Sequence, residues 1–187
     1  KARNLESMND FDDVNFYGMF EGDELIAQMK LIDFSMNLFG EMKPATGLMA
    51  LGVHPLHKKK GAAHEMVEFF EKYTRESGGL VSMLLPFRMD FYRSMGYGCG
   101  SKMDEYHIPT VQLPKCEKSE IARMRFLTQD EADDVMECYS RFAAKNHGAL
   151  LKFGEEIRDI RDDDEVRRIG YFDEGILKGY AAFIFEN

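Results

Sequence analysis

The stretch LMALGVHPLHKKKGAA, residues 48–63, decides how the rest of the sequence is interpreted. Leu48 to Val53 is a nearly continuous apolar run, which is typical of a strand buried on both faces of a sheet. Beyond Gly61, apolar side chains recur at the spacing of an amphipathic helix, at Ala63, Met66, Val67, Phe70 and Tyr73. The order of strand, basic loop and helix predicts a central unit of an α/β protein.

The same order of elements predicts an anion site. A helix N-terminus exposes backbone N–H groups and the positive end of the helix dipole. Lys58, Lys59 and Lys60 would add charge-assisted hydrogen bonds worth about 1.5–3 kcal/mol each when well placed. The alternative is a basic surface turn, because charge clusters are usually solvated. The glycine spacings of the Walker and dinucleotide loops are both missing.

The residues before this stretch predict a hairpin. Val14 to Phe20 is a short aromatic-rich run, and the turn residues Glu21-Gly22-Asp23 lead into a long second arm. The apolar positions of that arm change from odd to even numbers, which predicts a bulge or bend near Ile32. We expect a break at Pro44, and no strand in the opening residues 1–13.

The residues after the first helix predict three further elements. The helix should end near residues 77–79, where glycines allow a left-handed cap. Residues 80–85 form an apolar strand stopped by Pro86, and residues 90–96 a short helix with a glycine exit. An alternating pattern then predicts a strand from Tyr97 to about Ile108.

Prolines and charges at residues 109–120 predict a linker, and with it two domains. We expect a first domain over residues 1–113, a linker over 114–122 and a truncated second domain over 123–187. The second part predicts a strand at 123–127, a capping box of Thr128 and Glu131, a helix stripe through Phe142, and a hairpin at 169–185. Because this repeats the earlier hairpin and both ends look cut, we expect a fragment containing two related copies.

Composition limits the class of protein. The chain has 187 residues and a formal net charge of −9, with 44% hydrophobic residues but no apolar run long enough to span a membrane. The acidic balance argues against nucleic-acid binding. Its three cysteines are widely spaced, which predicts neither a disulfide framework nor a zinc site and favours the cytoplasm.

Two segments resemble the GCN5-related N-acetyltransferases. Lys58-x-x-Gly61-x-Ala63 is similar to their acyl-CoA signature, with lysine in place of the usual arginine or glutamine. Residues 84–97, LLPFRMDFYRSMGY, are similar to the segment in which a tyrosine on a short helix precedes a glycine-aromatic pair. The proline-containing strand exit and the second hairpin resemble the Eis-like branch. The resemblance implies a mixed α/β sheet, acetyl-CoA as co-substrate, no metal and a homo-oligomer.

The resemblance also implies a set of site residues. The backbone of Leu51, Gly52 and Val53 would hold the pantetheine arm, and the amides of residues 59–64 the pyrophosphate. The implied cofactor-binding residues are therefore Leu51, Gly52, Val53, Lys58, Lys59, Lys60, Gly61, Ala62, Ala63, His64, Phe87 and Arg88. No second Lys-x-x-Gly-x-Ala loop follows residue 114, so one acyl-CoA site is expected.

The resemblance makes Tyr92 the expected general acid, because a neutral phenol can protonate a leaving thiolate or hold it by a hydrogen bond. The alternative is an aromatic side chain packed on an amphipathic helix. His54, His57 and His64 crowd the loop, but none is assigned as a base or as a metal ligand. The implied activity is acetyl transfer to a primary amine of a cationic small molecule or a lysine. Two alternatives remain open: a silent acyl-CoA-binding sensor or scaffold, and an interaction protein with a basic patch.

Overall fold

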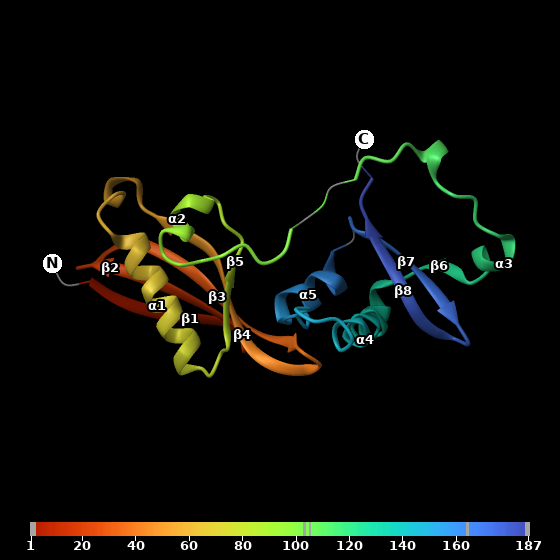
Figure 1. Cartoon of the computed structure of the whole chain (residues 1–187), viewed down its shortest axis with the longest axis horizontal. Coiled ribbons are helices and arrows are strands. Elements are labelled where there is room, and N and C mark those ends of the chain that lie inside the picture. Colours follow the sequence, from red (N-terminus) through yellow and green to blue (C-terminus); the bar gives the residue numbers. More distant parts are fainter. Residues whose placement is uncertain (1–2, 103, 105, 164, 186–187) are drawn as a thin grey trace.

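Two β-sheets organise the chain (Figure 1). The computed structural model describes residues 3–102, 104, 106–163 and 165–185. A five-stranded sheet lies in the first half, and a three-stranded sheet lies in the second.

The first sheet is mixed, with its strands in chain order. It contains β1 (Arg3–Phe11), β2 (Val14–Glu21), β3 (Glu24–Leu38), β4 (Glu41–Val53) and β5 (Val81–Leu84). Only the β4–β5 pair is parallel. The expectation that the opening residues hold no strand is wrong, because backbone pairing with β2 forms β1 as an edge strand. Edge strands need no continuous apolar run, so composition did not reveal this one.

Helix α1 (Ala62–Glu76) connects β4 to β5 and lies across one face of the sheet (Figure 1). Its apolar stripe supplies Met66, Val67 and Phe70, each at most 1% exposed, to a core shared with the strands. Burying such a side chain contributes about 1.5–3 kcal/mol. The helix ends as predicted, with Gly78 at φ 78° just beyond it. The periodicity of the sequence therefore placed this helix correctly.

The expected bulge does not lie at Ile32. Ile32 pairs in register with Val14 on one side and with Gly47 on the other. The irregularities lie earlier, where β2 pairs with Leu25 and then Ala27, leaving Ile26 as the extra residue. Residues 29–32 are all buried, so both faces of β3 are covered and the odd-to-even change needed no bulge.

Pro44 does not break the chain, as the sequence suggested, but lies inside β4 opposite Ser35. Proline is tolerated in a strand where its missing N–H is not required. Its carbonyl accepts a hydrogen bond from the N–H of Leu80 at 2.9 Å. Pro44 therefore contributes to the β4–β5 edge instead of ending it.

The second sheet is antiparallel and contains β6 (Met124–Phe126), β7 (Arg167–Asp173) and β8 (Ile176–Phe183). Helices α4 (Ala132–Ala143) and α5 (Gly154–Asp162) pack with it. The capping box predicted at Thr128 and Glu131 is present. A separate core joins these elements through Ala132, Val135, Cys138, Ile160 and Leu177.

The connection between the two sheets begins with α2 (Met89–Arg93) and contains a short 3-10 turn (Thr110–Gln112) and α3 (Lys118–Ile121). The predicted strand from Tyr97 to Ile108 is wrong, because none of the described residues in that range is in a strand. Tyr106 is 77% exposed and Ile108 is 56% exposed. Alternation alone does not make a strand, which also needs a neighbour for its backbone groups.

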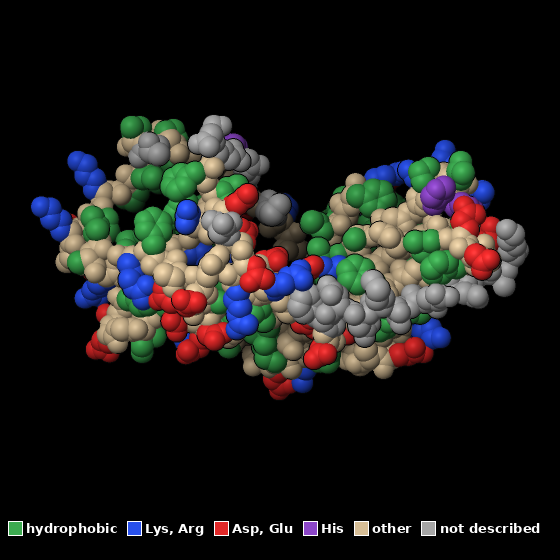
Figure 2. Space-filling view, turned by 180° about the vertical axis from the view of Figure 1, so that it is seen from behind, with side chains coloured by type: hydrophobic (Ala, Val, Ile, Leu, Met, Phe, Trp, Pro, Cys, Tyr) green, Lys and Arg blue, Asp and Glu red, His purple; other side chains and the backbone are tan. Residues whose placement is uncertain are grey.

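The far end of β3 joins the two halves. Asn37 is buried and donates hydrogen bonds to the carbonyls of Ala143 at 2.9 Å and Ala144 at 2.8 Å. Lys30, in the middle of the same strand, forms an ion pair with Glu155. Figure 2 shows the halves as two lobes with a notch between them. Among the described residues, no helix has the length and apolar character needed to cross a membrane.

Candidate active site

A bulge interrupts β4 just before its end. Gln28 of β3 pairs with Gly52, but Lys30 pairs with Met49, so Ala50 and Leu51 both lie opposite Met29. Ala50 has φ 50°, a left-handed conformation that non-glycine residues rarely adopt. A bulge of this kind bends the strand and turns its backbone groups out of the ladder.

The β4 and β5 strands separate at the same level. They pair from Ala45 with Val81 to Leu48 with Leu84, and β4 then continues to Val53 without a described partner on that side. The end of β4 therefore presents backbone N–H and C=O groups beside β5. This opening contains the predicted residues Leu51, Gly52 and Val53, which are all partly buried.

The basic loop follows the end of β4 through a short 3-10 turn (Pro55–His57) and leads into α1. Gly61 is the N-cap of α1 at φ 88°, where a side chain would strain the backbone. The first intrahelical bond runs from the N–H of Glu65 to the carbonyl of Gly61 at 3.0 Å. The preceding amides of Ala62, Ala63 and His64 point out of the helix end, as the first N–H groups of any helix do.

Charged side chains precede and follow these amides along the chain. Lys58, Lys59 and Lys60 are all exposed on the loop. The imidazole of His64 lies 3.3 Å from the carboxylate of Glu68, one turn along α1. The helix end, its positive dipole and the lysines together form a cradle that fits an anionic group such as a pyrophosphate.

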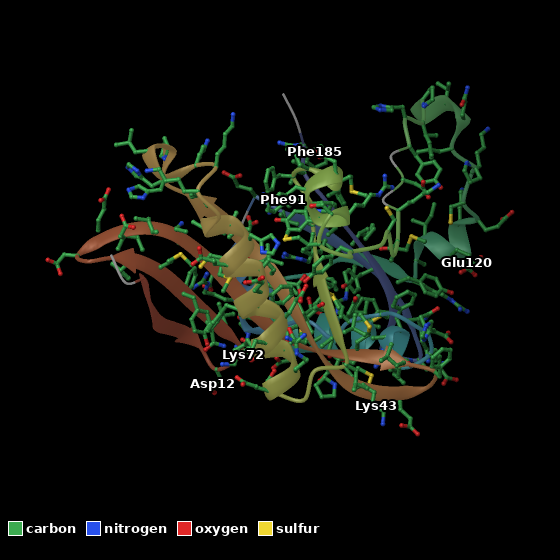
Figure 3. All side chains as sticks on the ribbon, turned by 60° about the vertical axis from the view of Figure 1, so that its left-hand side comes forward. Asp12, Lys43, Lys72, Phe91, Glu120 and Phe185 are labelled. Carbon is green, nitrogen blue, oxygen red and sulfur yellow. The ribbon has the colours of Figure 1, made fainter. Side chains whose placement is uncertain are left out.

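Tyr92, on α2, is only 4% exposed and belongs to the same core cluster as Leu48 and Ala62, with Leu51 and Val53 packed against it. Figures 1 and 3 place α2 beside the N-terminal end of α1. The structure therefore places Tyr92 in the core that the end of β4 and the start of α1 share. Burial raises the pKa of its phenol above the usual value, so Tyr92 keeps its proton at neutral pH.

Aromatic rings enclose Tyr92. The ring centroids of Phe91, Phe87 and Tyr97 lie 5.1, 5.8 and 6.0 Å from its own. Burial also raises the pKa of Tyr97 to about 12. These contacts fix the orientation of the Tyr92 ring, and they are also the contacts expected of a side chain that serves only to pack.

Two predicted residues lie at the exit of β5. Phe87 is 68% exposed and lies at the edge of the aromatic group around Tyr92. Arg88 donates from Nε to Asp90 at 3.1 Å, and this pairing lowers the pKa of the Asp90 carboxyl. The guanidinium of Arg88 is thus engaged with a neighbouring carboxylate.

The sequence did not predict the Ala50 bulge, because nothing in an apolar run marks where two residues oppose one. A hollow of about 650 Å³ on the second half was also not expected. It lies on the other sheet from the β4–β5 opening and is lined by Cys138, Tyr139, Arg141, Phe142, Lys145, Asn146, Lys178, Gly179 and Tyr180.

In this fold a strand separates from its neighbour beside a basic helix N-terminus. Residues 3–100 match the family model described as an acetyltransferase (GNAT) domain, which covers more than half of the chain. The chain therefore belongs to the GNAT acetyltransferases, and its class is that of an acyltransferase. Members of this family use acetyl-CoA as co-substrate, and the cradle at α1 fits its pyrophosphate.

Two solved structures share the fold over most of this chain. A conserved protein from Enterococcus faecalis V583, described as a probable N-acyltransferase, superposes with a TM-score of 0.77 at 16% identity and covers 100% of this chain. A GCN5-related N-acetyltransferase from Kribbella flavida superposes with a TM-score of 0.66 at 18% identity and covers 92%. This chain spans 56% and 44% of their respective lengths. The search of curated proteins found no match.

Proposed function

We propose that the chain is the acetyl-CoA-binding part of an N-acetyltransferase that acetylates a primary amine, either on a cationic small molecule or on a lysine. The observation that supports this proposal most strongly is the position of the β4–β5 separation, after Leu48 and Leu84. The separation opens beside the basic N-terminus of α1 and beside Tyr92. The core cluster that contains Tyr92 also contains residues of β4 and of the start of α1.

In this proposal the two parts of the site bind different parts of acetyl-CoA. The end of β4, at Leu51, Gly52 and Val53, provides backbone groups that form hydrogen bonds with the pantetheine arm, as they would with a neighbouring strand. The amides from Lys59 to His64 bind the pyrophosphate, and Lys58 to Lys60 add charge. Phe87 and Arg88 flank the opening from the β5 side, with Arg88 held by Asp90.

The reaction requires a proton donor for the leaving group. The nitrogen of the neutral amine attacks the thioester carbonyl carbon, the carbon–sulfur bond breaks, and the sulfur leaves as a thiolate. The new amide nitrogen releases its extra proton to water. A tyrosine has a pKa of about 10 and a thiol about 8.5, so complete proton transfer is uphill by about 2 kcal/mol even without burial. The Tyr92 hydroxyl therefore acts first as a hydrogen-bond donor to the developing thiolate, as a general acid does in the transition state.

The net charge of −9 supports a cationic acceptor, because an acidic protein raises the local concentration of positively charged molecules. We further propose a first domain over residues 1–113, a linker over 114–122, and part of a second GNAT-like domain over 123–187. The separate cores of the two sheets support this division. An Eis-like relationship, a homo-oligomer and a cytoplasmic location belong to the same proposal.

A silent acyl-CoA-binding module is the second candidate. The enclosure of Tyr92 by Phe87, Phe91 and Tyr97 favours it, since a catalytic hydroxyl must reach the sulfur. Measuring the release of CoA thiol from acetyl-CoA, with and without a panel of polyamines and lysine peptides, separates the two. An enzyme releases thiol faster when an amine is added, whereas a silent module binds acetyl-CoA with no amine-dependent release.

A further inference from the structure

Three side chains that could hold a metal ion meet beside the basic loop. They are Glu24, at the start of β3, and His54 and His57, which flank the turn after β4. One ligand atom from each residue can be chosen so that all three lie within 4.8 Å of one another. We propose that these residues form a zinc site that joins the β2–β3 turn to the β4–α1 loop.

The spacing of the two histidines places them together. His54-Pro-Leu-His57 spans one 3-10 turn, in which residues three apart project from the same side. The N–H of His57 donates to the carbonyl of His54 at 2.9 Å, and the N–H of His54 donates to the carbonyl of Ile26 at 2.8 Å. The backbone of both ligands is thus fixed against β3, only two residues from Glu24.

The distances suit zinc. With zinc–ligand bonds of about 2.0–2.1 Å, the ligand atoms of a tetrahedral site lie about 3.3 Å apart. Nε2 of His57 lies 3.2 Å from Oε1 of Glu24, close to that separation. Neither Glu24 nor His54 is buried, so their side chains can turn to close the remaining distance.

The proposed ligand side chains differ in how exposed they are. The His57 side chain is 9% exposed and therefore held in place, whereas that of Glu24 is 51% exposed. Three protein ligands leave the fourth position of a tetrahedral site for water, and the exposed Glu24 side chain gives the ion an entry path from solvent. Two neutral imidazoles and a carboxylate form a mixed nitrogen and oxygen set, which favours zinc over magnesium. Lys58 to Lys60 follow His57 directly, but they are exposed, so the high dielectric constant of water weakens their repulsion of the cation.

Zinc binding at this site requires no acetyl-CoA, so it stands apart from the proposed acetyl transfer. A bound ion would connect two segments 30 residues apart, Glu24 and His54, and restrain the loop that carries the lysines. The ordinary alternative is a histidine paired with a carboxylate, which needs neither His54 nor a metal.

The test is calorimetric titration of zinc chloride into the full chain, with magnesium chloride as the comparison. The wild type is expected to bind one zinc ion and no magnesium. Glu24→Gln and His54→Ala should each weaken zinc binding at least about 10-fold, because loss of an outer-shell partner alone typically costs 10–100-fold. His64→Ala, which removes another exposed loop histidine, should leave zinc binding unchanged.

Two further measurements check that the variants fold and that zinc binds at the loop. Both variants change exposed side chains, and circular dichroism melting without metal should show them folded like the wild type. Hydrogen exchange at residues 55–61 should slow when zinc is added to the wild type but not to Glu24→Gln. Equal zinc affinity in Glu24→Gln, His54→Ala and the wild type would overturn the proposal. So would zinc binding that disappears only when the exposed Cys99 and Cys116 are changed to serine.

Discussion

Gly61 offers the sharpest test of the acyl-CoA cradle. It caps α1 at φ 88°, and a Cβ at this position would meet only the Glu65 carboxylate, at 3.6 Å. A tryptophan is therefore accommodated toward solvent, but it covers the outward-pointing amides of Ala62 and Ala63. The left-handed conformation should cost about 1–2 kcal/mol of the free energy of unfolding.

The effect on binding should exceed the effect on stability. A hydrogen bond from an amide to a charged oxygen is worth about 1.5–3 kcal/mol, and each 1.4 kcal/mol corresponds to tenfold in affinity. Losing one such bond predicts that Gly61→Trp binds acetyl-CoA about 10-fold to 140-fold more weakly in calorimetry at 25 °C.

Gly78 provides the matched control. It has φ 78°, lies just beyond the opposite end of α1, and a Cβ there meets nothing within 4 Å. Gly78→Trp should lose similar stability in a urea titration but bind acetyl-CoA like the wild type. Equal affinity in a folded Gly61→Trp protein and the wild type would refute the placement of the pyrophosphate at α1.

Three other predictions concern Tyr92, the joint between the halves and the capping box. Tyr92→Phe should keep acetyl-CoA affinity and lower turnover about 10²- to 10⁴-fold, the usual range for general acid catalysis, and a wild-type rate would leave Tyr92 a packing role only. Asn37→Ala should lower the free energy of unfolding, measured in urea, by about 1–3 kcal/mol because two carbonyls lose their donor. Asn146→Ala should change it little, because the exposed Asn146 amide donates only to the Phe142 carbonyl, at 2.7 Å. Equal losses in the two variants would contradict this account of the joint. Hydrogen bonds from Arg125 lower the pKa of Glu131 from 4.5 to about 2, so its stabilising contribution is present above pH 4.5 and lost as the pH falls toward 2. Glu131→Gln should remove that part of the acid sensitivity in melting curves, and an unchanged pH profile would show that the carboxylate contributes nothing.

Sequence patterns predicted the elements that are formed by interactions between residues close together in the sequence. The apolar period of α1 and the glycine after it fixed both ends of that helix, because helical hydrogen bonds form within one segment. The hairpin at Gly22 and the capping box at Thr128 were found for the same reason. The loop at Lys58 to Gly61 was recognisable because its residue types and order directly determine its chemistry.

Features that depend on a distant partner could not be predicted. The strand β1 forms because β2 offers a neighbour, and the segment from Tyr97 to Ile108 does not form a strand although its pattern alternates. The buried second face of β3 depends on the other half of the chain, through contacts such as that of Lys30 with Glu155. Similarly, Glu24 lies far from His54 in sequence and only the sheet register brings them together.

Hydrogen exchange of the wild-type chain with and without acetyl-CoA tests the central claim most directly, because it locates the bound cofactor residue by residue. The proposed site predicts slower exchange at residues 51–64, along the end of β4 and the start of α1, and at residues 84–92 beside them. The amides of β7 and β8 should exchange as before. Protection confined to the second half around Cys138 and Tyr180, or no protection anywhere at saturating acetyl-CoA, would contradict an acyl-CoA site in the β4–β5 opening.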